Sequence, residues 1–184
     1  WNVMYDGLLK VPMPEEASMV AFADDVAILI RGKATSSLRL AAEEALLNVK
    51  RWLDGAGLEL AVHKTEAVFF TRRRKLAPPE IEFDGFDIPF SRSIRYLGVY
   101  LDDKLRFAVH AEQAAAKAAR VAEELARLMP NVGGPKPKRR RLYCEVVHSI
   151  LLYGAPVWAD SMRVERTRLK LARVQRRSAL RVIS

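Results

Sequence analysis

The chain has 184 residues, half of them hydrophobic, so it is large enough to bury a core as one large domain or two small ones. Its formal net charge of +9 favours a polyanionic partner, either a nucleic acid or an anionic membrane surface. No apolar run approaches the roughly 18 to 20 residues that span a bilayer, so we expect a soluble protein with no membrane partner. The single cysteine excludes a disulfide framework and a cysteine zinc site, which fits a reducing intracellular compartment.

The first predicted elements are a helix, a loop and a hairpin. WNVMYDGLLKVPMPEEAS begins as a helix and ends as a loop, because its two prolines cannot continue a helix. The stretch VAFADDVAILI at 20–30 then predicts two strands with Asp24 and Asp25 at the turn. Hairpin turns usually carry Asn-Gly or Asp-Gly, whereas Val26 follows here, so we expect an exposed acidic tip. From the residues alone, an ordinary turn and a metal-binding pair of carboxylates both stay open.

A second helix follows the hairpin. We expect an N-cap from Thr35 to Ser37, and we expect Gly55 and Gly57 to end the helix. Between these signals, apolar residues recur at helical spacing, namely Leu38, Ala42, Ala45, Val49 and Trp52.

The next forty residues are predicted to be mostly extended. LELAVHKTEAVFF at 58–70 predicts extended structure, and Asp84-Gly85 predicts the turn of a further hairpin. The pattern also predicts one strand from Tyr96 to Leu101. Residues 1–105 therefore have an α+β pattern.

From Phe107 onward the pattern is helical. One apolar stripe alternates spacings of four and three, through Phe107, Ala111, Ala114, Ala118, Val121, Leu125 and Leu128. PNVGGPKPK breaks this helix, and a second helix runs toward Pro156 through Leu142, Val146, Ile150 and Leu151. A third helix is predicted from about Met162 to the chain end at RRSALRVIS, where an abrupt stop suggests a piece of a longer chain.

The third helix carries a basic stripe along one side and apolar residues along another. The apolar side holds Val164, Leu171, Ala172, Ala179, Val182 and Ile183. Because the stripe is one-sided and has no matching acids, it suits a surface that follows a phosphate backbone, as does KPKRRR at 136–141. A solvated helix face is the alternative. The expected nucleic-acid-binding residues are Lys138, Arg139, Arg140, Arg163, Arg166, Lys170, Arg173, Arg177 and Arg181.

Several short motifs occur in one order along the chain. FADD at 22–25, HKTE at 63–66 and YLGV at 96–99 follow each other, between the opening WNVMYDGLL and the later LLYGAPVW. Together they resemble the reverse transcriptases of non-LTR, LINE-type retrotransposons, and are similar to insect elements that insert into ribosomal DNA. The resemblance implies an α+β fold, in which residues 1–105 form a partial polymerase palm, an antiparallel sheet plus a helix. It implies an all-helical, basic thumb and connection region at 106–184.

The resemblance also implies roles for particular residues. Asp24 would be a metal-ligating carboxylate and Asp25 its neighbour, with two Mg²⁺ ions expected in the complete polymerase. Lys64 would approach the incoming triphosphate and stabilise the charge on the leaving pyrophosphate. A primer grip, the hairpin that supports the primer strand, would be formed by Tyr96, Leu97 and Gly98.

By resemblance, the activity is that of an RNA-directed DNA polymerase, which adds dNTPs to a primer 3′ hydroxyl on an RNA template. The implied partners are the RNA template, the DNA primer, dNTP and the remainder of the polymerase chain, in the nucleus where target-primed synthesis occurs. Ala61 stands where many relatives carry Asn. The family's first catalytic carboxylate lies upstream of the FADD hairpin and Asp6 is a poor substitute, so we expect this chain to be inactive alone.

Two other functions stay open. The first is a non-catalytic remnant that binds nucleic acid. The second is a helical protein-interaction module, in which the alanine-rich helix at 107–129 docks a partner and Asp24 and Asp25 form only a turn. The interaction module predicts no salt-dependent binding of RNA or DNA, whereas the other two functions predict affinity that falls steeply with salt.

Overall fold

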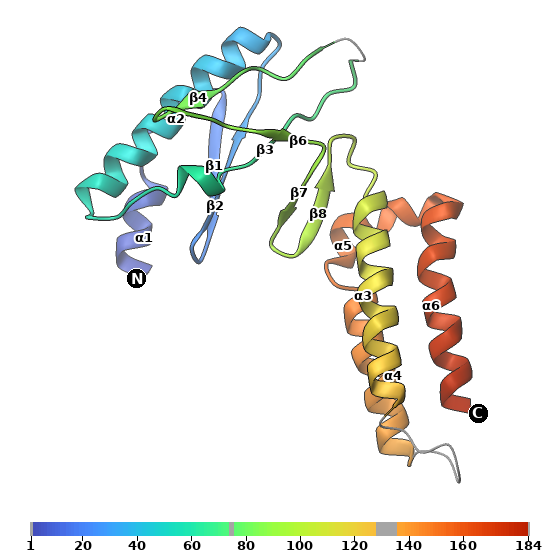
Figure 1. The fold of residues 1–184 in the computed structure, drawn as a ribbon. Helices are drawn as coiled ribbons and strands as arrows, with labels where there is room; N and C mark the ends of the chain where they lie inside the picture. Colours follow the sequence, from blue (N-terminus) through green and yellow to red (C-terminus); the bar gives the residue numbers. More distant parts are fainter. Residues whose placement is uncertain (1, 74–75, 128–135, 184) are drawn as a thin grey trace. The chain divides into compact units, whose positions relative to one another are not determined.

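The computed structural model describes residues 2–73, 76–127 and 136–183 (Figure 1). These residues form two compact units, 1–92 and 93–184. Both units combine helices with short strands, which confirms the predicted α+β class. In the described part of the chain the strands form four two-stranded sheets, three of them antiparallel and one parallel.

The first unit is built on a helix pair and a hairpin. In chain order its elements are α1 (Asn2–Leu9), β1 (Ala17–Phe22), β2 (Asp25–Ile30), α2 (Thr35–Gly55), the 3-10 helix η1 (Val62–Lys64), β3 (Ala67–Val68), β4 (Glu82–Phe83), β5 (Phe86–Asp87) and β6 (Phe90–Ser91). The predicted opening helix, the FADD hairpin and the second helix are therefore confirmed. Helix α2 packs on both strands of the hairpin, and α1 contacts α2 and β1.

Helix α2 begins without the predicted side-chain cap. The residue before the helix is Ala34, which makes no side-chain cap, and Ser37 instead donates its hydroxyl back to the Ala34 carbonyl at 2.9 Å. The N-cap expected from Thr35 to Ser37 is therefore wrong, because these residues already form the first helical turn. The predicted core face is confirmed at Ala42, Ala45 and Val49, which are buried.

The segment after α2 is less extended than its composition predicts. Only Ala67 and Val68 of the 58–70 stretch form a strand, and they pair in parallel with β6. The lysine motif lies on η1, where the Lys64 amide donates to the Ala61 carbonyl. The hairpin expected at Asp84-Gly85 is confirmed, and both turn residues have the positive φ angles that a type I′ turn requires.

Two small hydrophobic clusters hold the first unit together. One cluster joins α2 to the segments around β4 and β5 through Ala42, Val62, Ile81, Phe83 and Ile88. The other joins α1 to α2 through Leu8, Val11 and Val49, with Met19 and Ile28 of the hairpin packed against it. One face of the β1–β2 hairpin is thus anchored by both helices.

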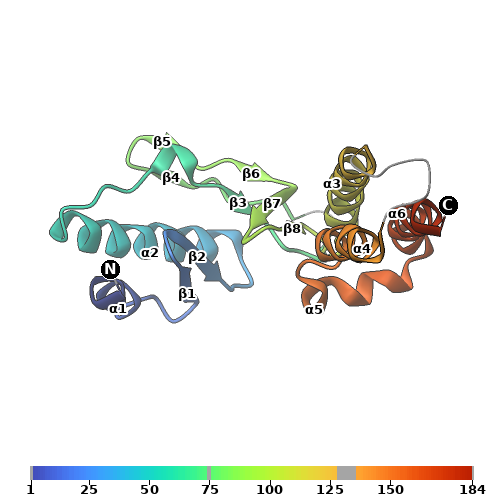
Figure 2. The ribbon, with the colours of Figure 1, turned by 90° about the horizontal axis from the view of Figure 1, so that it is seen from below.

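The second unit is a hairpin followed by helices. Its elements are β7 (Ser93–Tyr96), β8 (Val99–Asp102), α3 (Ala108–Ala126), α4 (Pro137–Leu151), the short α5 (Ala155–Trp158), the 3-10 helix η2 (Ala159–Arg163) and α6 (Glu165–Ile183). Figure 2 looks along α3, α4 and α6, which lie side by side and contact one another. The single strand predicted from Tyr96 to Leu101 is wrong, since the chain turns at Leu97 and Gly98 and forms a hairpin there, as the YLGV resemblance implies.

The core of the second unit is built on the alanine face of α3. Ala111, Ala114 and Ala118 are buried against Val147 of α4 and Leu171 of α6. This face is covered by the chain itself, so the premise that it docks an external partner is wrong. The predicted stripe member Leu128 and the break at 130–135 lie outside the described residues.

Two helical faces agree only in part with their predictions, which are confirmed at the buried Leu151 and Leu171. In α4 the buried residues are Tyr143, Val147 and Leu151, while Leu142 is exposed. In α6 the buried residues are Thr167, Leu171 and Ser178, with Val182 partly buried beside them. Four predicted apolar-face residues of the last helix are exposed instead, namely Val164, Ala172, Ala179 and Ile183. That helix starts at Glu165, because α5 and η2 precede it.

The two compact units divide after Arg92. The β7–β8 hairpin therefore belongs with the helices that follow it. The predicted palm and thumb boundary at 105 concerns functional domains and stays a prediction.

Among the helices that the structure describes, no single one has both the length and the apolar character for crossing a membrane. Among these helices, only the pair Pro137–Leu151 and Ala155–Arg163 reaches that length and apolar character when the two are taken together, and the pair is bent by 47°.

A buried histidine makes the stability of the second unit sensitive to pH. His110 is 4% exposed, its Nδ1 accepts the Tyr100 amide at 3.4 Å, and its ring lies 5.5 Å from that of Trp158. Burial lowers the pKa of His110 below its ordinary value of 6.5. The unfolded chain therefore binds a proton first as pH falls, so we expect stability to drop below about pH 6.5 until the folded-state pKa is reached. Urea unfolding at pH 7.5 and 5.5 measures this loss.

The control for this pH dependence uses two glutamine variants. His110→Gln is expected to lose less stability between the two pH values than the parent chain. His148→Gln, which changes an exposed histidine, is expected to behave like the parent. Equal losses in both variants would contradict the assignment to His110.

Candidate functional site

The FADD motif forms the tip of the β1–β2 hairpin. The last strand pair is Phe22 with Asp25, so the two turn residues are Ala23 and Asp24. The turn therefore lies one residue earlier than predicted, and Asp25 is the first residue of β2. Both carboxylates are exposed, which confirms the expected acidic tip.

The hairpin tip contains a strained alanine. Ala23 has a φ of 54°, a left-handed conformation in which an L side chain crowds the backbone. Ala23→Gly is expected to stabilise the first unit by about 0.5 to 1 kcal/mol, since relief of strain exceeds the extra entropy of glycine in the unfolded chain. Ala21→Gly in the regular strand β1 is the matched control and should destabilise by a similar amount. Urea unfolding of both variants measures the difference, and destabilisation by both would contradict the strain at residue 23.

The hairpin has one covered and one open face. Directly opposed residues share a face, so Phe22 and Asp25 lie on the same side of the hairpin. That side carries the exposed side chains of Val20, Phe22 and Leu29, which are 50%, 65% and 51% exposed. The opposite face packs on α1 and α2. The acidic tip thus stands at the end of an open apolar face.

The two carboxylates supply only part of a metal site. Carboxylate oxygens are the hard donors that Mg²⁺ prefers, so Asp24 and Asp25 fit this ion chemically. A two-metal centre needs donors converging from several segments. Within the described ranges no three Asp, Glu, His or Cys side chains gather as ligands, and Asp6 forms an ion pair with Lys10 on α1.

The lysine of the HKTE motif is exposed on η1. Among the described residues no hydrogen bond or ion pair joins Lys64 to either carboxylate. The structure thus leaves its ammonium group open to a ligand without showing a contact to Asp24 or Asp25.

The residues of the predicted primer grip form the tip of the second unit's hairpin. Tyr96 ends β7, and Leu97 and Gly98 make the turn with φ angles of 45° and 82°. Tyr153 donates its hydroxyl to the Leu97 carbonyl at 3.0 Å. A side chain on Gly98 would meet the Tyr153 ring, since a Cβ there would lie 2.8 Å from Cε1. The space beside Gly98 is therefore filled on that side by Tyr153.

The predicted cations Lys138, Arg139 and Arg140 lie in the first turn of α4. Lys138 and Arg139 are exposed and Arg140 is partly buried, with no acidic residue in that turn. Cations at a helix N-terminus are unfavourable because the helix dipole is positive there. An anion bound at this end would offset the repulsion.

The basic stripe on α6 differs from its prediction in one respect. Lys170 pairs with Glu112 and Arg177 pairs with Glu123, both at 2.8 Å, so acids of α3 match the stripe. The Lys170 hydrogen bond, and then its charge, lowers the pKa of Glu112. The same side of α6 also bonds through Arg181 to the Ala126 carbonyl. These cations tie α6 to α3.

Other cations of the last helical segment are more open. Arg163 pairs with Asp160 at 3.2 Å on the exposed surface, and Arg166 and Arg173 are exposed. Sequence reasoning missed Arg168 and Arg176, which are both exposed. Arg176 lies on the side of α6 opposite the buried residues, whereas Arg168 flanks them. Helical spacing from the buried Leu171 is the signal that places Arg176 on that opposite side.

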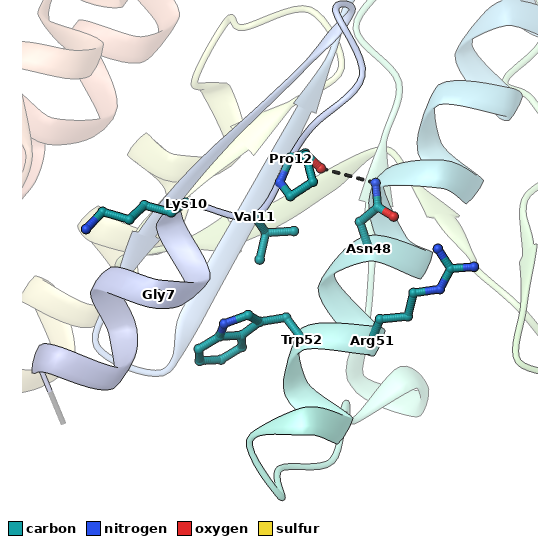
Figure 3. Close-up of a pocket in the computed structure, with 7 residues that line it drawn as sticks. All are labelled: Gly7, Lys10, Val11, Pro12, Asn48, Arg51 and Trp52. Carbon is teal, nitrogen blue, oxygen red and sulfur yellow. Dashed lines mark hydrogen bonds between the residues drawn. The ribbon is translucent and has the colours of Figure 1, made fainter.

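The first unit also has a pocket of about 390 Å³ between α1 and α2 (Figure 3). Trp52 reaches from α2 toward Gly7, where a Cβ would lie 3.1 Å from its ring, and Asn48 donates to the Pro12 carbonyl at 3.1 Å. Lys10 and Arg51 stand at its rim. None of the predicted site residues lines this pocket.

Comparisons with known proteins connect this geometry to a family. Residues 1–101 match the family model described as reverse transcriptase (RNA-dependent DNA polymerase). The chain is 29% identical over 177 residues to a putative 115 kDa protein in the type-1 retrotransposable element R1DM of Drosophila melanogaster, covering 96% of this chain and 17% of that protein. It is 26% identical over 184 residues to a retrovirus-related Pol polyprotein from the type-1 retrotransposable element R1 of Nasonia vitripennis, covering 96% and 54%.

A third relative extends the comparison to another element. The chain is 25% identical over 161 residues to the probable RNA-directed DNA polymerase from transposon BS of Drosophila melanogaster, covering 86% of this chain and 18% of that protein. No solved structure matches the chain. The chain thus spans about half or less of the length of these relatives. Because the family model covers more than half of it, the chain belongs to the reverse transcriptase family, and its relatives place it with the LINE-type enzymes of insect non-LTR retrotransposons.

Proposed function

We propose that the chain is the C-terminal part of the polymerase domain of an RNA-directed DNA polymerase. Residues 1–105 are its partial palm, and residues 106–184 its thumb and connection region. The observation that carries the proposal is the pair of exposed carboxylates at the tip of a hairpin inside the family match. In the reaction, the primer 3′ hydroxyl loses its proton and attacks the α-phosphate of a dNTP. A new phosphodiester bond forms and pyrophosphate leaves.

The two carboxylates and Lys64 are proposed to act on the phosphates. Asp24 and Asp25 would hold divalent ions, with Mg²⁺ fitting their donor chemistry, and the bound ions would neutralise phosphate charge during transfer. The exposed ammonium of Lys64 would stabilise the negative charge that develops on the leaving pyrophosphate. Tyr96, Leu97 and Gly98 would support the primer strand.

The remaining partners are proposed from the family and from the length of the relatives. A template, a primer and dNTP follow from the polymerase family. We propose the rest of the polymerase chain as a further partner, because the chain covers 54% and 17% of two relatives and its described residues provide no third carboxylate at the tip. The chain is then inactive alone. Its proposed place of action is the nucleus, at the site of target-primed synthesis.

Primer extension on an RNA template with Mg²⁺ and dNTP tests the proposal. The 184-residue chain is compared with a protein extended upstream to the full polymerase domain of the same element. Extension by the longer protein only is the expected result. Extension by neither, although both fold and bind RNA, would favour the non-catalytic remnant, for which the incomplete carboxylate set is the supporting observation. Absence of any salt-dependent binding would contradict both functions.

The open cations of α6 are expected to contact phosphates. Replacing Arg168, Arg173 and Arg176 together by Gln should weaken binding of an RNA–DNA duplex and lower the slope of log affinity against log salt by about one per phosphate contact. The matched control replaces Arg163, Lys170 and Arg177, which already pair with acids, and should change the slope less. Binding titrations between 50 and 200 mM salt, with helix content checked by circular dichroism, measure both slopes. Equal slopes in the first variant and the parent would show that these arginines are only solvated and do not contact phosphates.

A further inference from the structure

The turn of the β7–β8 hairpin is unusual for its residues. Leu97 and Gly98 both have positive φ, as a type I′ turn requires, but this turn normally uses Asn, Asp or Gly at its first position. A leucine in the left-handed region is strained. The surroundings of the turn must therefore compensate for this conformation.

Tyr153 supplies two contacts to the turn from 56 residues away. Its hydroxyl donates to the Leu97 carbonyl at 3.0 Å. Its ring occupies the space beside Gly98, where a Cβ would lie 2.8 Å from Cε1 and 3.3 Å from the hydroxyl oxygen. Glycine at 98 thus serves both the turn angle and the fit of this ring.

Gly154, the residue after Tyr153, makes a similar fit in which the two segments exchange roles. Gly154 has a φ of 65°, and a Cβ on it would lie 2.7 Å from Cγ2 of Val99. Each of the two segments therefore presents a glycine to a side chain of the other. Gly98 receives Tyr153, and Gly154 receives Val99.

The tyrosine is itself fixed by the core of the helical unit. The Trp158 indole donates Nε1–H to the Tyr153 carbonyl at 2.8 Å. Trp158 is 2% exposed and belongs to the same buried cluster as Val99. The turn is thus connected through Tyr153 to a tightly packed part of the unit, although the Tyr153 side chain itself is 55% exposed.

We propose that Tyr153 is a positioning residue, which holds the Leu97–Gly98 turn in the conformation that supports the primer strand. The positioning part rests on the proposed function, because it assumes that this turn contacts primer. The YGAPVW segment at 153–158 then serves the reaction indirectly. It fixes the hairpin tip against the helices.

The test removes the hydroxyl alone. Tyr153→Phe is compared with Leu152→Ala, a change at the exposed neighbouring residue, and with the parent chain. Hydrogen exchange of the Val99 amide, next to the turn, is expected to become about 2- to 10-fold faster in Tyr153→Phe, the range for loss of one hydrogen bond. Affinity for an RNA template with a recessed DNA primer is expected to fall by a similar factor. Affinity for unprimed single-stranded RNA is expected to stay unchanged.

The outcomes separate this proposal from the function on which it rests. Unchanged exchange at Val99 in Tyr153→Phe would overturn the proposal whatever the chain binds. Faster exchange with unchanged primer affinity would overturn the positioning role. If the parent chain does not distinguish primed from unprimed RNA, the proposed contact of the turn with primer is contradicted. The hydrogen-exchange data then still test whether Tyr153 stabilises the Leu97–Gly98 turn. Leu152→Ala should match the parent in every measurement.

A second variant pair checks the ring contact independently. Gly98→Ala places a Cβ against the Tyr153 ring and also strains the backbone at a φ of 82°. In a Tyr153→Ala background the clash is absent, so the loss of stability caused by Gly98→Ala should be smaller. An equal loss in both backgrounds would overturn the proposed contact.

Discussion

Asp24→Asn in the full polymerase is expected to lower DNA synthesis by about 10²- to 10⁴-fold, since a bound divalent ion supplies several kcal/mol of transition-state stabilisation. Asparagine keeps the size of the side chain and is favoured in turns, so the hairpin should keep its shape. The side chain of Asp24 is exposed, so its replacement should cost little stability. Binding of primer and template should therefore stay close to that of the parent, and a filter-binding assay beside primer extension measures both quantities.

Asp84→Asn is the matched control for this loss. Asp84 is also an exposed aspartate in a two-residue hairpin turn of the same unit, although it pairs loosely with Lys50 at 3.5 Å. Its replacement should leave synthesis unchanged. Retained synthesis in Asp24→Asn, or an equal loss in Asp84→Asn, would contradict the role of the FADD tip in catalysis.

Trp158→Ala is expected to destabilise the second unit by about 3 to 5 kcal/mol, the usual cost of deleting a large buried aromatic side chain. The indole is 2% exposed, contacts the His110 ring and donates the hydrogen bond to the Tyr153 carbonyl. Its removal leaves a cavity and an unpaired carbonyl together. Urea unfolding followed by far-ultraviolet circular dichroism measures the loss without depending on tryptophan fluorescence.

The neighbouring Val157 provides the control for Trp158. It is 58% exposed, so Val157→Ala should change the free energy of unfolding by no more than about 0.5 kcal/mol. A similar small change in Trp158→Ala would show that the second unit does not depend on this part of its core.

The sequence predicted the hairpin at the FADD motif because two short apolar runs flank two acidic residues. It placed the turn one residue late, since a turn that uses alanine at positive φ has no sequence signal. The motifs of the resemblance located the candidate residues, and the YLGV hairpin was recovered by resemblance where alternation alone predicted a single strand. Local patterns were thus sufficient where polar residues interrupt two apolar runs, and insufficient where the turn uses an apolar residue at positive φ, as at Ala23 and Leu97.

The helical faces show a second reason for the differences. In α4 the predicted Leu151 is buried, but the predicted Leu142, Val146 and Ile150 have the same spacing as the buried Tyr143, Val147 and Leu151. Periodicity therefore cannot choose between two faces one residue apart. Packing against α3 decides it. For α6, the acids that neutralise Lys170 and Arg177 lie on α3, more than fifty residues earlier, so a stripe judged within its own helix looks free of partners.

The mutual fit of Gly98 with Tyr153 and of Gly154 with Val99 limits how the polymerases of related retrotransposons can be recombined. Residues 98 and 99 fit residues 153 and 154 as a set. The hairpin of one polymerase is therefore compatible with the helices of another only if the two carry matching small and large side chains at these positions. A crossover between residues 102 and 151 separates the two halves of the set. Chimeras with breakpoints there should fold less well than chimeras joined before Ser93, where the hairpin and helices are inherited together.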